Sequence, residues 1–491
     1  MINKKAILFS LLTCSILILY HPSSVRSQCA YTVLFQNPSE EMPSDMVEDS
    51  TGIFYAVGYA GYDSKPWEFR GLAYRISSAT DTMSRRISFQ DTVTRFFKII
   101  PRPDQTFTIL GTVSNPPDYH ERLMVAIMDK NLNILSRKEY ALKNYDRIDR
   151  MEYIMGRDNS IWLYGSLGNR PDPAMDFFMC KLNPEGDTIK TGFYYLYHPL
   201  AYSALFSPDS SMLWIFGSNF NFDGYGQRAV FDTSFNFISV KNIQSYVDPN
   251  MNTRWFPSGK VLLGGKYVFF RTTQDDDIGI SFIDSALNNP EIHYFGALDT
   301  IDNPGAERFL DFITPSRIFF TGSHDHHFGF YPHGVSWIMT GLLDSSLNTI
   351  YQQFYGGDAE YNPFSLLATK DGGSMIAGTK FDYHTQDNEM DIIFLKFDST
   401  GSITGTLPPE VNQPYSFIVY PNPGQDYIQL TGNLEGLLFE LYDQKGSLVR
   451  SIQLVNGNNA IPTDDLPTGT CYLYQIINSR KVIFTGKWIK K

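Results

Sequence analysis

The apolar residues of this chain stand in short runs, and each run is broken by turn-forming Asp, Gly, Asn or Pro. Residues 364–405 show the pattern most clearly, as "FSLLATKDGGSMIAGTKFDYHTQDNEMDIIFLKFDSTGSITG". It predicts four strands joined by an Asp-Gly turn, a polar loop and a second turn. Because no segment keeps the 3.6-residue period of a helix, we predict an all-β fold.

The turn and second strand of this unit recur seven times along the chain. They read "DSTGIFYAVG", "RPDQTFTILG", "RDNSIWLYG", "SPDSSMLWIFG", "PSGKVLLGG", "TPSRIFFTG" and "KDGGSMIAG". The glycines that close them are Gly58, Gly111, Gly165, Gly217, Gly264, Gly322 and Gly378, spaced 53, 54, 52, 47, 58 and 56 residues apart. A period of this kind is the signature of a repeat architecture.

The third strands of five units reach an aspartate at or just past their end. These residues are Asp129, Asp232, Asp284, Asp344 and Asp398. An aspartate at this place accepts backbone N–H groups of the following turn, so we predict a structural role for all five.

Seven four-stranded units predict a seven-bladed β-propeller over residues 28–405. A propeller hides its sheet edges only when the ring closes. The segment "AYTVLFQ", residues 30–36, resembles the fourth strand "SRRISFQ" and is predicted to pair with the last blade. The repeats also resemble those of secreted propeller proteins of Gram-negative bacteria. The longest loops join second to third strands and share one face, which is the expected binding surface.

The first residues, "MINKKAILFSLLTCSILILYHPSSVRSQ", predict a secretory signal peptide over residues 1–27. Lys4 and Lys5 form its positive end, and an apolar run follows. A membrane anchor is the alternative, but fifteen apolar residues are fewer than the ~20 that span a bilayer. No later segment is long enough either, so we predict no transmembrane segment.

Net charge limits the classes of partner that the chain can bind, and cysteine content limits its disulfide and zinc sites. The chain carries a formal net charge of −12 and no Lys/Arg cluster, which argues against nucleic acid and anionic lipid as partners. Cys29, Cys180 and Cys471 would remain after cleavage, far apart in the chain. Three distant cysteines predict neither a disulfide framework nor a zinc site.

Histidines gather in the long loop of the sixth unit, "SHDHHFGFYPHGVSW". Four of the nine histidines of the chain lie within these residues. His324, His326 and His333 are therefore the candidate ligands of a metal ion. The alternative is a solvated, aromatic-rich binding loop, and no other cofactor is predicted.

No catalytic constellation emerges from the sequence. "SPDSSMLW" approximates the aspartate box of sialidases, which is a structural turn in that family and supports a propeller only. No pair of carboxylates is singled out as acid and base, and the nucleophile-elbow, zinc-protease and Walker motifs do not occur. We therefore predict no catalytic residues.

The chain changes character after Gly405. Residues 406–416, "TLPPEVNQPYS", read as an extended linker. Residues 417–491 then carry short alternating strands separated by turns such as "NLEG", "NGNN" and "LPTG". This pattern predicts a compact β-sandwich.

The motifs "YPNPGQDYIQL", "FELYDQKGSLV" and "DLPTGTCYLYQI", followed by "KWIKK", resemble the C-terminal sorting domain of type IX secretion, type A. The residues that carry the match are Tyr420, Pro421, Asn422, Pro423, Gly446, Leu466 and Gly469. Cys471 departs from the family, which usually has an aromatic residue there. The resemblance implies recognition by the type IX machinery, passage through the outer membrane and removal of the domain by a surface sortase. The alternative is a generic adhesion sandwich.

Together these features predict a secreted or surface-displayed propeller that binds a glycan or protein without catalysis. The alternative is a secreted hydrolase or lyase that acts on polysaccharide in the central funnel. A convergent carboxylate pair or an arginine cluster on the long-loop face would favour the enzyme. An apolar, aromatic rim would favour the binding protein.

Overall fold

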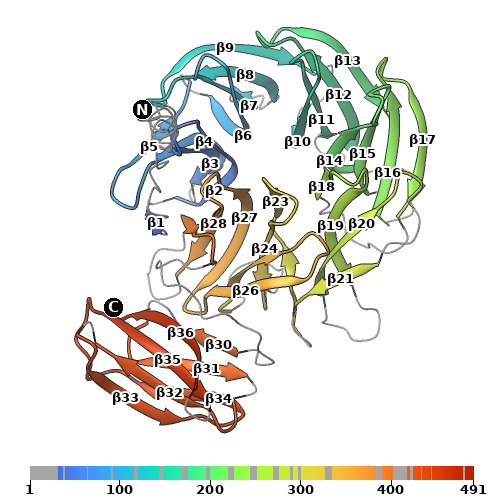
Figure 1. Cartoon of the computed structure of the whole chain (residues 1–491). Coiled ribbons are helices and arrows are strands. Elements are labelled where there is room, and N and C mark those ends of the chain that lie inside the picture. Colours follow the sequence, from blue (N-terminus) through green and yellow to red (C-terminus); the bar gives the residue numbers. More distant parts are fainter. Residues whose placement is uncertain are drawn as a thin grey trace, which may run out of the picture.

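The structure is a computed structural model of the whole chain (Figure 1). It describes residues 31–491 except for 37–38, 63–64, 90–91, 116–119, 143–146, 169–174, 195–198, 219, 221–225, 244–251, 269–275, 288–290, 297–299, 327–333, 383–389, 402–416, 421–423, 433, 444 and 479–480. The predicted signal peptide and linker lie outside these residues. Among the described residues every regular element is a strand, and no helix has the length and apolar character to cross a membrane. The predicted all-β class is confirmed.

Seven antiparallel sheets, numbered 1 to 7 in chain order, are formed between Tyr31 and Phe397. Sheet 1 contains β2 (Glu41–Glu48), β3 (Phe54–Tyr62), β4 (Lys65–Ile76) and β5 (Thr82–Ile87); sheet 2 contains β6 (Val93–Pro101), β7 (Phe107–Ser114), β8 (Arg122–Met128) and β9 (Ile134–Ala141). Sheet 3 contains β10 (Arg147–Met155), β11 (Ile161–Gly168), β12 (Met175–Leu182) and β13 (Thr188–Tyr194); sheet 4 contains β14 (Leu200–Phe206), β15 (Met212–Ser218), β16 (Gly226–Asp232) and β17 (Phe237–Asn242). Sheet 5 contains β18 (Asn252–Trp255), β19 (Val261–Val268), β20 (Asp276–Ile283) and β21 (Ile292–Phe295); sheet 6 contains β22 (Asn303–Pro304), β23 (Leu310–Phe312), β24 (Ile318–His324), β25 (Trp337–Leu343) and β26 (Thr349–Gly356).

Sheet 7 draws its strands from both ends of this region. It contains β27 (Glu360–Ala368), β28 (Ser374–Phe381), β29 (Met390–Phe397) and the N-terminal strand β1 (Tyr31–Phe35). β1 pairs antiparallel with β29, and Val33 stands opposite Phe394. The predicted pairing of the N-terminal segment with the last repeat is confirmed.

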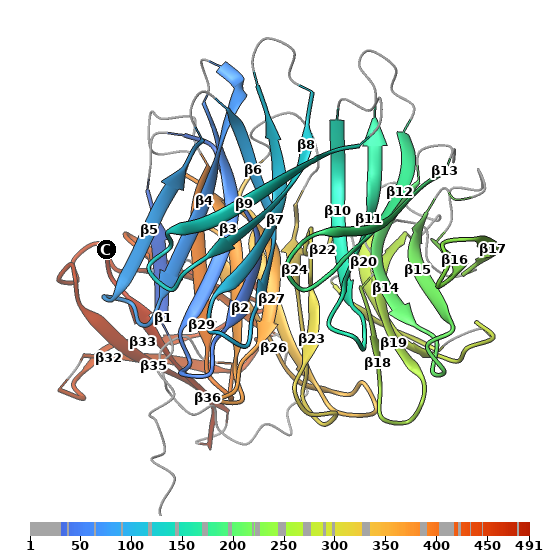
Figure 2. The same cartoon turned by 90° about the horizontal axis from the view of Figure 1, so that it is seen from above.

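The sheets stand side by side around a centre, with the first strand of each nearest to it (Figure 1), and their strands run between the two faces of the ring (Figure 2). Seven buried apolar clusters each join two consecutive sheets, and one of them joins sheet 7 to sheet 1. In β7, Ile109 packs toward sheet 1 and its neighbour Leu110 toward sheet 3. Both faces of a second strand are therefore buried, which explains why these strands are continuous apolar runs.

The recurring glycines are explained by close backbone approach. The sequence pattern suggested that each second strand ends at its glycine, but the structure corrects this, since β3 runs past Gly58 to Tyr62. At six of the seven positions a Cβ atom would lie within 2.7 Å of a carbonyl oxygen of the first strand, as at Gly165 beside Arg150. Five of the first strands carry a register shift at this point. The glycines therefore recur because the bulge in the neighbouring first strand leaves no room for a side chain.

The five aspartates that follow third strands cap their turns as predicted. Each accepts a backbone N–H from the residue two positions later, at 2.8 to 2.9 Å. In the "SPDSSMLW" segment Asp209 accepts the N–H of Ser211 in the same way. These carboxylates are thus occupied by the backbone.

The last part of the chain forms two further sheets around one core. The first contains β30 (Phe417–Tyr420), β31 (Tyr427–Gly432) and β34 (Gly457–Pro462). The second contains β32 (Leu438–Tyr442), β33 (Leu448–Gln453), β35 (Cys471–Asn478) and β36 (Lys481–Ile489). Ile428 of the first and Trp488 of the second belong to the same buried cluster. A bridge between Gly424 and Lys490 joins the start of this unit to its end.

Candidate functional site

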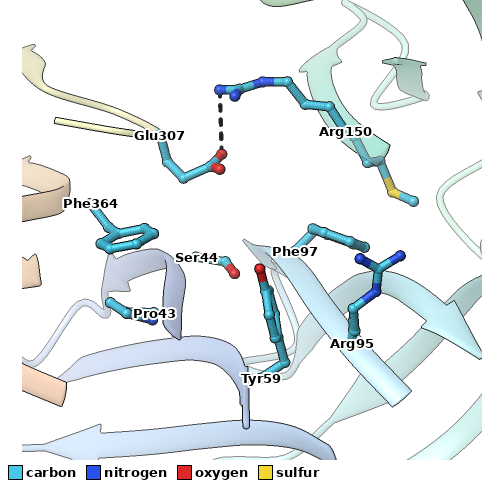
Figure 3. A pocket seen from close by; sticks show the side chains of 9 residues that line it. Pro43, Ser44, Tyr59, Arg95, Phe97, Arg150, Glu307 and Phe364 are labelled. Carbon is cyan, nitrogen blue, oxygen red and sulfur yellow. Dashed lines mark ion pairs between the residues drawn. The ribbon is translucent and has the colours of Figure 1, made fainter. Parts of the chain in front are cut away.

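A cavity of about 80 Å³ lies at the centre of the ring (Figure 3). Its walls come from strands that are far apart in the sequence, and the lining residues are Pro43, Ser44, Tyr59, Arg95, Phe97, Arg150, Met151, Glu307 and Phe364. Those that belong to first strands stand at or shortly before the middle of the strand. Because second strands end on the side where first strands begin, the cavity lies about halfway through the ring, slightly toward the face that carries the long loops. Those loops fall largely outside the described residues.

Glu307 reaches the cavity because the first strand of sheet 6 is interrupted. Between β22 and β23, residues 306–308 hydrogen-bond to sheet 7, whereas Gly305 and Phe309 on either side still bond to Thr321 of β24. The N–H of Glu307 donates to the Phe364 carbonyl at 2.8 Å, and Arg308 forms a parallel bridge with Ser365. This segment lies in the longest interval of the glycine period, 58 residues. The irregular repeat therefore delivers a carboxylate to the centre.

Two cations and two carboxylates meet beside the cavity. Lys98 Nζ lies 2.7 Å from Glu152 Oε1 and 3.1 Å from Glu307 Oε2. Arg150 Nη2 lies 3.6 Å from Glu152 and 3.5 Å from Glu307. The Arg150 guanidinium also stacks on the ring of Tyr202, 3.8 Å from its centroid. These contacts cross the centre of the ring and tie sheets 2 and 3 to sheet 6.

The two carboxyl groups titrate differently. Burial raises the pKa of Glu152 to about 7, against the opposing attraction of Lys98. Burial acts in the same direction on Glu307, but Arg150 and Lys98 outweigh it and lower its pKa. Lys98 keeps a raised pKa, because its two carboxylate partners overcome the cost of burying its charge. Of the two, Glu152 therefore takes up a proton at the higher pH, while Glu307 stays charged.

Three more ion pairs surround this cluster. Arg95 Nη2 lies 2.6 Å from Glu121 Oε1 and also donates to the Ile148 carbonyl at 3.0 Å. Arg308 pairs with Asp45 at 3.2 Å, and Arg254 pairs with Asp311. Asp45 in turn accepts the N–H of Ile99, in sheet 2. The arginines of the centre are thus held by carboxylates and by the backbone.

The predicted metal ligands do not meet at one point among the described residues. His324 Nδ1 lies 2.6 Å from Asp302 Oδ1, whereas His326 Nε2 lies 3.1 Å from Glu360 Oε1. His333 lies outside the described residues. In the described part of the chain no group of three or more His, Cys, Asp or Glu side chains is arranged to hold a metal ion. The metal site in this loop stays a prediction.

The sorting-motif residues have mostly conformational roles where they are described. Gly446 and Gly469 have φ of 81° and 69°, a region that side chains other than glycine rarely adopt. Leu466 is buried in the core of the last two sheets. Tyr420 ends β30, and Pro421, Asn422 and Pro423 lie outside the described residues. Cys471 begins β35 opposite Ile489 and carries a free thiol.

The charges of the centre were missed in the sequence analysis, although a signal was present. The first strands "VTRFFKIIP" and "RIDRMEYIM" contain Arg95, Lys98, Arg150 and Glu152 next to apolar residues of the core. A charge inside a buried strand calls for a partner. Which carboxylate supplies it depends on the curvature of the whole ring.

Comparison with known families identifies the last unit. Residues 418–491 match the family model described as the secretion system C-terminal sorting domain. This part of the chain is a sorting domain. It directs export by type IX secretion, to the cell surface or beyond, which confirms the predicted route. The sorting domain covers less than half of the chain, so it identifies the delivery route and leaves the activity open.

Solved structures resemble the chain only distantly. A bacterial surface component of the type IX secretion system of Porphyromonas gingivalis, PorZ, is 12% identical, with a TM-score of 0.38 over 91% of this chain and 59% of that one. An acylaminoacyl peptidase of Pyrococcus horikoshii is 11% identical, with a TM-score of 0.41 over 81% of this chain and 58% of that one. An α-L-arabinanase of Penicillium chrysogenum is 12% identical, with a TM-score of 0.38 over 62% and 92%. The chain spans about three fifths of the length of the first two. No curated protein matches it.

Proposed function

We propose that the chain is an exported, seven-bladed β-propeller that binds a glycan or protein at the cell surface without converting it. In this proposal, sheets 1 to 7 are the blades and β1 closes the ring. The last two sheets form the sandwich that a surface sortase removes after export. The signal peptide at residues 1–27 starts the route.

The cycle of buried clusters supports the propeller. Each cluster joins neighbouring sheets, and the cluster that contains Val33, Tyr74 and Phe394 joins the last sheet to the first. A sheet buried on both faces has no stable existence outside such a ring. The pairing of β1 with β29 covers the edge that the last blade would otherwise expose.

The size and charges of the central cavity favour binding over catalysis. Its volume of about 80 Å³ is several-fold below the roughly 300 Å³ of the smaller ligand pockets, so a sugar ring does not fit inside it. Glu152 and Glu307 share Lys98 and Arg150, which leaves neither carboxyl group isolated as an acid or base. A polymer would therefore bind on the long-loop face, above the cavity.

A hydrolase or lyase that acts on polysaccharide is the second candidate. Two carboxyl groups of different pKa with arginines nearby are the kind of arrangement that acid-base chemistry uses. In the chain this pair is Glu152 and Glu307. The candidate would need the site to open beyond the volume it has here.

A binding screen combined with a product assay tests the proposal. The exported chain is applied to an array of neutral and acidic glycans, and each ligand found is then incubated with the chain and analysed by mass spectrometry. We expect binding with no change in ligand mass. Turnover that disappears in Glu152→Gln and Glu307→Gln variants would instead establish the enzyme.

A further inference from the structure

The central cavity has hydrogen-bond donors that the protein leaves unused. Ser44 is 5% exposed, and its hydroxyl has no hydrogen-bond partner among the described residues. The Tyr59 hydroxyl has none either, and Figure 3 shows both hydroxyl oxygens pointing into the same part of the cavity. Because these hydroxyls line the cavity and have no protein partner, both are available to a ligand or to ordered water.

Arg95 adds a charged donor to this wall. Its contacts to Glu121 and to the Ile148 carbonyl all use Nη2. The guanidinium also lies over the ring of Phe97, 5.1 Å from its centroid. Its other N–H groups have no hydrogen-bond partner in the described part of the chain, and the residue lines the cavity. The acceptor in the cavity, Glu307, is already held by Lys98 and Arg150. The groups left for a ligand are therefore two hydroxyls, which can donate or accept, and the remaining N–H groups of Arg95, which only donate.

We propose that the cavity binds the carboxylate group of an acidic sugar, with Ser44, Tyr59 and Arg95 as its donors. This inference rests on the proposed binding function and names the ligand class. A carboxylate accepts several N–H and O–H bonds at once, which matches the donors present. The cavity has room for a few waters or one such group, and the rest of the sugar would lie above it.

The charge of the site favours an anion at mildly acidic pH. Arg95, Lys98 and Arg150 face Glu121, Glu152 and Glu307. The titratable groups that act on Glu152 are Lys98 of β6, Arg150 and Tyr153 of β10, Tyr164 of β11 and Glu307. The pKa of Glu152 is raised to about 7, so its protonation leaves this group of six residues with one positive charge in excess. Binding should weaken as the pH rises past 7.

Calorimetric titration of the exported chain with D-glucuronate at pH 6 tests the site. D-glucose is the neutral control, and acetate represents a free carboxylate. We expect glucuronate to bind, glucose not to bind, and acetate to bind more weakly. Removal of one donor, in Ser44→Ala or Tyr59→Phe, should weaken glucuronate binding about tenfold.

Ser365→Ala is the matched control variant. Ser365 is also buried in a first strand and its hydroxyl has no partner among the described residues, but it does not line the cavity. Its affinity for glucuronate should equal that of the wild type.

Four results would overturn the assignment. The proposed site is wrong if glucuronate does not bind at pH 6. It is also wrong if wild type, Ser44→Ala and Tyr59→Phe bind glucuronate equally well. Equal affinity for acetate and glucuronate would show that the sugar ring contributes nothing to binding. Affinity that rises from pH 6 to pH 8 contradicts the charge balance. Glycan binding on the array that persists in Ser44→Ala would leave the proposed function standing while the carboxylate site fails.

Discussion

Replacement of Val33 by aspartate should open the ring at its closure. Val33 is 7% exposed on β1 and lies in the cluster that joins the last sheet to the first. Its neighbour Leu34 points the other way and is 37% exposed. Because successive residues of a strand face opposite sides, the two substitutions place the same charge on opposite faces of one strand.

The expected cost follows from burial. Loss of a buried valine costs about 1.5 kcal/mol or more, and an unpaired charge in an apolar cluster adds about 3 kcal/mol. Val33→Asp should therefore lower the unfolding free energy by about 4 kcal/mol or more. Leu34→Asp should change it by at most about 0.5 kcal/mol, as surface substitutions do.

Guanidinium unfolding followed by tryptophan fluorescence measures both variants. Chemical unfolding suits this chain, because unfolding entropy grows by about 2 cal/mol/K per residue and makes the shift in Tm small for a long domain. We expect a lower midpoint for Val33→Asp with an unchanged slope. Equal midpoints for the two variants would refute closure by β1.

Three further predictions concern the repeat glycines, the charged cluster at Glu152, and the sorting domain. Gly165→Ala places a Cβ 2.0 Å from the Arg150 carbonyl oxygen and should lower the unfolding free energy by about 3 kcal/mol. In the control Gly61→Ala, the Cβ meets only a side chain, at 3.1 Å. An equal loss of unfolding free energy in both variants would contradict the close approach at the bulge. The pKa of Glu152 is about 7 in the folded chain, against an ordinary value of 4.5. The protonated side chain therefore contributes about 3 kcal/mol to the unfolding free energy below pH 4.5, and this contribution is lost as the pH rises through 7. The free-energy difference between wild type and Glu152→Gln should shrink by that amount between pH 4.5 and 8, whereas a constant difference would reject the raised pKa. Deletion of residues 418–491 should leave the chain inside the cell in a fractionation assay, and its appearance in the medium would contradict the sorting role.

The repeat was predictable from the sequence because its cause is local and recurs. Six of the seven glycines face a carbonyl oxygen of the neighbouring strand, and each turn aspartate accepts an N–H group from only two residues away. The pairing of β1 was predictable since its sequence resembles the fourth strand of another unit. The sorting domain was recognised from motifs whose glycines, such as Gly446, adopt positive φ.

The centre was not predictable, because the contacts that close it join residues far apart in the sequence. Lys98 and Glu307 are 209 positions apart, and they meet only when the ring brings sheet 6 opposite sheet 2. The interruption that carries Glu307 appears in the sequence only as a long interval between glycines. The sequence singled out no pair of carboxylates, so the Glu152 and Glu307 pair was not foreseen.

The central claim is binding without turnover by an exported propeller. Its most direct measurement is prolonged incubation of the exported chain with the glycan or protein that it captures, at pH 6 and pH 8, with free and bound ligand quantified by mass spectrometry. We expect saturable binding and a ligand of unchanged mass throughout. Accumulation of cleaved ligand in proportion to protein and time would contradict it.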